Sequence, residues 1–157
     1  MKLVVAVAIL FSGGCIAGAG YSTRDRVTTA AREYNDGVRW GKYEQAALHV
    51  PKEKRDNFLE RHKNFEDELE IADYELVAIN IDKSDRKHEK ITARVDYTWS
   101  LKRRGLVEKT TTEQVWEEND GEWMVAKEER LKGAPLALFD EPAPKTASKP
   151  SQTGPKQ

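Results

Sequence analysis

The stretch KITARVDYTWSL, residues 90–101, decides the fold class. Apolar side chains occupy every second position in it, and polar ones lie between them. The apolar set is Ile91, Ala93, Val95, Tyr97, Trp99 and Leu101. Alternation of this kind is typical of a half-buried strand in an antiparallel sheet. The other set, which includes Arg94 and Asp96, is therefore expected to face solvent or a partner.

Three more segments predict strands around this one. DYELVAINID (73–82) precedes it, with Val77, Ile79 and Ile81 expected on one side and Tyr74, Leu76 and Ala78 on the other. LVEKTTTEQVWEE (106–118) and EWMVAKEERL (122–131) follow it. The Asn-Asp-Gly sequence at 119–121 is a hairpin signal, because Asp-Gly supplies the positive φ that such turns need. The region predicts four antiparallel strands in hairpin succession.

The residues before the strands predict three helices. Val27, Ala30, Ala31, Tyr34 and Val38 recur at intervals of three and four. This is the stripe of an amphipathic helix, with Thr23 placed to cap it and Gly41 to end it. KYEQAALHV (42–50) predicts a second, shorter helix. PKEKRDNFLERHKNFEDEL (51–69) predicts a third, with an apolar face of Phe58, Leu59, His62, Phe65 and Leu69. The predicted fold class is α+β, with three N-terminal helices packed on a four-stranded antiparallel sheet.

The N-terminus predicts export. Lys2 precedes the apolar run Leu3–Phe11, and small residues 12–14 then lead to Cys15, the one cysteine of the chain. This pattern resembles the lipobox of bacterial lipoproteins, although Ser12 stands where that family usually has Leu. The resemblance implies a signal peptide over residues 1–14 and an acylated, lipid-bound Cys15. Cleavage after Ala17-Gly18-Ala19 and a retained membrane span are the alternatives.

The location and domain boundaries follow from this reading. In bacterial lipoproteins an Asp directly after the lipidated cysteine commonly retains the protein in the inner membrane. This chain has Ile16 there, which favours the outer membrane, with the protein facing the periplasm. Residues 15–22 would then form a tether that spans at most about 25 Å. Residues 23–140 form the predicted domain. Residues 141–157 hold four of the six prolines and no aromatic residue, so a disordered tail is expected there.

Composition and motifs exclude several classes of function. The chain has 26 Lys and Arg against 27 Asp and Glu, so no nucleic-acid partner is expected. One cysteine permits no internal disulfide. His49, His62 and His88 do not have metal-site spacing, so no metal site is expected. No phosphate-loop, dinucleotide-binding or nucleophile-elbow motif occurs, so no cofactor is expected.

AAREYNDGVRWGKYEQAALHV (30–50), the four strands and WEENDGEWMV (116–125) together resemble the NTF2-like, or SnoaL-like and cystatin-like, α+β cone. A Trp, Gly and Trp hairpin is frequent near the end of that family, and Trp116, Gly121 and Trp123 match it. The resemblance covers about residues 23–130 and implies helices packed across a strongly bent sheet. Because this fold hosts enzymes, binding modules and dimerisation domains, it assigns no function.

Seven aromatic residues are the candidate pocket or interface residues. They are Tyr34, Tyr43, Tyr74, Tyr97, Trp99, Trp116 and Trp123. The predicted function is a non-catalytic, membrane-anchored envelope lipoprotein that binds a protein partner, forms a homodimer through the sheet face, or supports an envelope assembly. The alternatives are a small-ligand pocket, and a SnoaL-like isomerase or dehydratase that uses Asp96 or a histidine.

Overall fold

The computed structural model describes residues 21–83 and 90–139. The predicted signal peptide, Cys15, most of the tether, His88 and the tail lie outside these residues.

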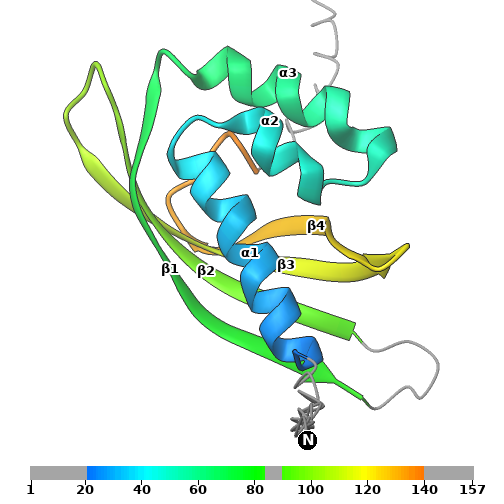
Figure 1. Cartoon of the computed structure of the whole chain (residues 1–157). Coiled ribbons are helices and arrows are strands. Elements are labelled where there is room, and N and C mark those ends of the chain that lie inside the picture. The colour runs from blue at the N-terminus through cyan, green and yellow to red at the C-terminus, as the bar shows by residue number, and fades with distance from the viewer. Residues whose placement is uncertain (1–20, 84–89, 140–157) are drawn as a thin grey trace, which may run out of the picture.

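The described chain is α+β, as predicted, with the helices before a four-stranded antiparallel sheet (Figure 1). The strands follow one another in the order β1-β2-β3-β4. The elements are α1 (Thr23–Arg39), α2 (Tyr43–Ala46), the 3-10 turns η1 (Ala47–His49) and η2 (Lys52–Lys54), α3 (Arg55–Phe65), β1 (Leu69–Asp82), β2 (Lys90–Leu101), β3 (Val107–Asn119) and β4 (Glu122–Gly133).

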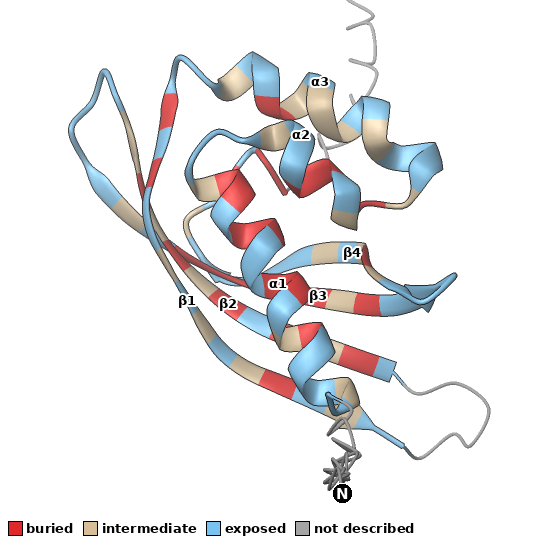
Figure 2. Cartoon of the chain, viewed as in Figure 1, coloured by how far each residue is buried: buried red, intermediate tan, exposed pale blue. Residues whose placement is uncertain are grey.

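The helix α1 lies across the curved sheet and buries the stripe that the sequence predicted (Figure 2). Its cap is Ser22, one residue before the predicted Thr23, because Ser22 and Asp25 form a reciprocal capping box. The chain leaves the helix through Gly41, whose φ of 66° suits glycine. The predicted end of this helix is confirmed.

The second and third helices differ from the prediction. The second is one α-helical turn followed by η1, and α3 is shorter than expected, with Leu69 already in β1. The helix α1 packs against β1 and β4, whereas α3 packs against α2 and η1. The expectation that all three helices pack on the sheet is therefore wrong for α3. The helices α1 and α2 pack closely, since a Cβ on Gly37 would lie 2.8 Å from that of Ala46.

The core lies between α1 and the concave face of the sheet, and a segment after β4 completes it. Leu136, Leu138 and Phe139 are buried there. The chain turns into this segment at Gly133, which has a φ of 91°. A Cβ at Gly133 would lie 2.2 Å from the carbonyl oxygen of Lys109, so no other residue fits this turn without a backbone shift.

Irregular pairing in two strands changes which side chains face the core. In β4, Val125 pairs with Trp116 and Lys127 pairs with Val115, so Ala126 is an extra residue. A bulge of this kind inverts the alternation beyond it. Glu128 consequently pairs with Gln114 and joins the face of the buried residues. A similar shift in β1, between Leu76 and Ala78, leaves Val77 46% exposed, whereas Ile79, which was predicted to lie on the same side, is buried.

Candidate functional site

Three elements bring hydrogen-bond donors to one carboxylate, that of Glu128 on β4. Its Oε1 lies 2.7 Å from Thr112 Oγ1, 3.1 Å from Gln114 Nε2 and 3.2 Å from the Tyr97 hydroxyl. Its Oε2 accepts a hydrogen bond of 3.0 Å from the Tyr34 hydroxyl. We call these five residues the Glu128 network; they come from α1, β2, β3 and β4.

Further hydrogen bonds hold Gln114 and Tyr97 of the Glu128 network in place. Asn35 Nδ2 donates to the carbonyl oxygen of Ala31 at 2.6 Å, and Asn35 Oδ1 accepts from Gln114 Nε2 at 2.9 Å. The Tyr97 hydroxyl also contacts Asn35 Oδ1. Trp116 Nε1 donates to Gln114 Oε1 at 3.3 Å. The Tyr97 hydroxyl has one proton and lies between two acceptors, Asn35 Oδ1 and Glu128 Oε1. When Tyr97 donates to Asn35, a proton on Glu128 would allow Glu128 to donate to the Tyr97 oxygen.

Burial sets the protonation of the Glu128 network. Burial raises the pKa of Glu128 to about 6, while hydrogen bonds from Thr112 and Gln114 oppose the rise. Burial, together with the charge of Glu128, raises the pKa of Tyr34 and of Tyr97 well above 10. The tyrosines therefore stay protonated near neutral pH. Glu128 is the group that can accept or release a proton there.

A cavity of about 340 Å³ adjoins this carboxylate, between α3, β4 and the segment after β4. Tyr34 and Glu128 line it together with apolar side chains. The apolar lining residues are Val50, Phe58, Val125, Ala126, Leu138 and Phe139. Lys54, Arg61 and Lys127 add positive charge, and Glu53 adds a second acidic group. The volume suits a small organic molecule.

His62, on α3, also lines the cavity and is 1% exposed. Its Nδ1 lies 2.8 Å from the carbonyl oxygen of Phe58, and its ring lies 3.9 Å from the Phe58 ring. Burial lowers the pKa of His62 to about 4, so the ring is neutral near pH 7. A carbonyl only accepts, so Nδ1 carries the hydrogen. Nε2 is therefore a bare acceptor, and it is buried without a partner among the described residues.

The structure brings together two of the seven predicted aromatic residues, Tyr34 and Tyr97, at Glu128. Tyr43 lies beside the cavity, with its ring 5.0 Å from that of His62. Trp116 is wholly buried, with its ring 6.1 Å from that of Tyr34. It is a core residue and offers no surface to a partner.

The other three predicted aromatic residues lie elsewhere. The Tyr74 hydroxyl donates to Asp36 Oδ1 at 2.9 Å on α1, and burial raises the pKa of Tyr74 to about 12. Trp99 is buried and donates to Thr110 Oγ1 at 2.9 Å. Trp123 is half-buried, and its indole nitrogen has no partner among the described residues. None of these three lines the cavity.

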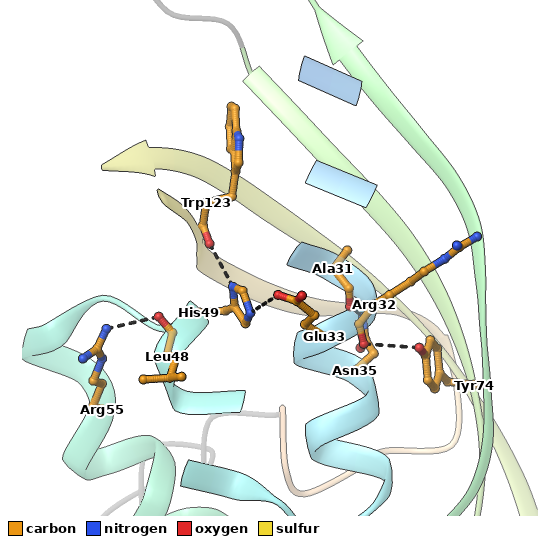
Figure 3. Close-up of polar contacts among 9 residues, drawn as sticks. All are labelled: Ala31, Arg32, Glu33, Asn35, Leu48, His49, Arg55, Tyr74 and Trp123. Atoms are coloured by element: carbon orange, nitrogen blue, oxygen red, sulfur yellow. Dashed lines mark hydrogen bonds and ion pairs between the residues drawn. The ribbon is translucent and has the colours of Figure 1, made fainter. Parts of the chain in front are cut away.

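Of the polar residues considered as enzymatic candidates, His62 lines the cavity, whereas Asp96 and His49 lie outside it. Asp96 is on the sheet face opposite Val95 and Tyr97, where Thr111 donates to it. His49 links the helices to β4, with Nδ1 3.2 Å from the carbonyl oxygen of Trp123 and Nε2 3.1 Å from Glu33 Oε2 (Figure 3).

Sequence reasoning missed Glu128, Asn35 and two residues of β3. Thr112 and Gln114 could have been found, because they alternate in step with Trp116. Asn35 follows Tyr34 in the sequence and lies on the buried side of α1. No alternation could have found Glu128, because the bulge at Ala126 reverses the pattern before it.

No protein-family model, curated protein or solved structure matches the chain. Within residues 21–83 and 90–139, no helix is both long and apolar enough to cross a membrane. The same residues contain no group of three His, Cys, Asp or Glu side chains placed to hold a metal ion.

Proposed function

We propose that this chain is a lipid-anchored protein of the bacterial cell envelope whose domain, an NTF2-like cone, binds a small organic ligand beside Glu128. One observation carries the ligand-binding role: a half-buried carboxylate held by four donors adjoins a cavity of about 340 Å³. Burying a carboxylate costs stability, so its position at a cavity wall is typical of a binding site.

The curvature of the sheet around α1 supports the cone (Figure 1). The segment after β4 supports it as well, because Leu138 and Phe139 close the hollow between sheet and helices. An experimental structure in which β1 to β4 form a flat sheet would contradict this part of the proposal.

Ring-sized fragments are expected to bind in the cavity. With isotope-labelled protein, phenol and cyclohexanol should shift the amide NMR signals of residues 57–62 and 125–128, which border the cavity. Ala126→Trp places a large side chain in the cavity and should abolish these shifts. The measurement is a fragment titration followed by NMR.

Ala72→Trp is the matched control, because Ala72 is an exposed alanine of β1 outside the cavity. This variant should bind the fragments as the unchanged protein does. Fragment shifts that persist at the same positions in Ala126→Trp would place binding elsewhere and remove the ligand-binding proposal.

Replacing Cys15 by Ser is expected to release the protein from the membrane, because acylation requires the thiol. Fractionation of cells should find the parent in the membrane pellet and the variant in the soluble fraction. Mass spectrometry of the parent should find an acylated Cys15 as the first residue. An N-terminus at Gly20 would instead mean that an ordinary signal peptide had been removed together with Cys15.

A SnoaL-like isomerase or dehydratase is the second candidate, favoured by the pKa of Glu128 near 6. A carboxylate with this pKa suits proton transfer near neutral pH. Glu128 would be the base, in place of Asp96. The test is exchange of the α-hydrogens of cyclohexanone with deuterated water, since equal exchange by the parent and Glu128→Gln would remove this candidate. Binding of a protein partner or a second copy through the sheet face stays a prediction from the sequence.

A further inference from the structure

We infer that the natural ligand of the cavity has an apolar body and donates two hydrogen bonds, one to Glu128 and one to His62. Hydroxyl and amine groups on a ring or short hydrocarbon fit this description. The inference rests on the proposed ligand-binding function and adds the class of ligand.

The first acceptor is His62 Nε2. The hydrogen on Nδ1 is committed to the carbonyl oxygen of Phe58, so the tautomer leaves a lone pair on Nε2. That atom is buried without a partner among the described residues, and burial of an unpaired acceptor costs free energy. Nε2 has almost no accessible surface in the structure, so a donor in the cavity that His62 lines would remove this cost once the ring turns toward it.

The second acceptor is Oε2 of Glu128. A carboxylate oxygen has about two lone-pair positions, and three donors surround Oε1. Oε2 accepts one hydrogen bond within the described chain, from Tyr34. One position on Oε2 is thus available to a ligand, and Tyr34 lines the same cavity as Glu128.

The rest of the lining determines the body of the ligand. Phe58, Val125, Leu138 and Phe139 supply apolar contact, which disfavours a sugar with polar groups on every side. Arg61 and Lys54 could attract an anion instead. However, Glu53 lines the same cavity and offsets one of these positive charges. An anion placed near Glu128 would also meet a like charge above pH 6.

Three related fragments test the inference on the full chain. Catechol donates two hydrogen bonds, 1,2-dimethoxybenzene has the same ring without donors, and benzoate is an anion. NMR titration should give catechol at least about tenfold tighter binding than either of the others, as expected for a hydrogen bond to a buried acceptor. His62→Leu should remove most of this preference, because it should lower the affinity for catechol far more than the affinity for 1,2-dimethoxybenzene.

His49→Leu is the control, because His49 lies outside the cavity and should leave the catechol preference intact. The imidazole nitrogen signals of the unchanged protein give a readout that does not depend on a variant. The His62 Nε2 signal should move with catechol and stay in place with 1,2-dimethoxybenzene.

The outcomes separate the two proposals. If the fragments bind in the cavity but catechol has no advantage, or benzoate binds best, the inference about donors is overturned and the ligand-binding function stands. If none of the three fragments binds there, the ligand-binding function and the inference both fail.

Discussion

Replacing Glu128 by Leu is expected to lower the free energy of unfolding by about 3 kcal/mol. Leucine has nearly the same size and no acceptor. The hydroxyls of Tyr34, Tyr97 and Thr112 and the Gln114 amide would all lose a contact. They could bond to one another only by moving, because Asn35 and Trp116 hold Gln114 in place. Urea denaturation at pH 7 measures the loss.

Glu128→Gln is the matched control, because an amide of the same shape keeps one acceptor and the hydroxyls can rotate to face its NH₂ group. Its stability should lie within about 1 kcal/mol of the parent at pH 5. A Leu variant as stable as the Gln variant would mean that the network contributes nothing to stability.

The pH dependence of the parent should reveal the raised pKa of Glu128. The folded protein holds the Glu128 proton up to about pH 6, whereas the unfolded chain releases it near pH 4.5. The contribution to stability is therefore complete below about pH 4.5 and is lost as the pH rises through 6. The expected loss is about 2 kcal/mol. The difference in stability between parent and Glu128→Gln should follow this curve, which removes the contribution of the other carboxyl groups.

Trp116→Ala is expected to lower the free energy of unfolding by about 4 kcal/mol, in the range for deletion of a large buried aromatic side chain. Trp116 is wholly buried, and its ring lies near those of Tyr34 and His49. Its indole nitrogen also supports Gln114. The substitution should therefore weaken the core and the Glu128 network together. Urea denaturation gives the loss, and fragment titration should find weaker binding.

Trp40→Ala is the control for the same change at the surface. Trp40 is 64% exposed, and its ring lies 4.7 Å below the Arg39 guanidinium. Its removal should change stability by less than about 1 kcal/mol. A Trp116 variant as stable as this control would contradict the assignment of Trp116 to the core.

The regular parts of the fold could be predicted because they depend on local periodicity. The stripe from Val27 to Val38 and the alternation of residues 90–101 both have one buried side, and both predictions are confirmed. The Asn-Asp-Gly turn has positive φ at Asp120 and Gly121, as expected. In each case, neighbours a few residues apart determine which side is buried.

The candidate site could be predicted only in part, because it depends on breaks in that periodicity. Tyr34 and Tyr97 lie on predicted buried faces, whereas Glu128 reaches the core through a bulge whose position depends on pairing with β3. The return of Leu136 to Phe139 depends on the turn at Gly133 and on space left between α3 and the sheet. A pattern in one strand does not contain this information.

The direction of α1 has a consequence for how a ligand would arrive. This helix is about 25 Å long, and it begins at the end of the domain nearest Cys15 in the sequence and runs toward α3 (Figure 1). If Cys15 is the anchor, the cavity lies toward the end of the domain away from the attachment point. The ligand would then be supplied from the periplasmic water and need not first dissolve in the bilayer. Such a supply route favours compounds with enough hydroxyl or amine groups to be soluble.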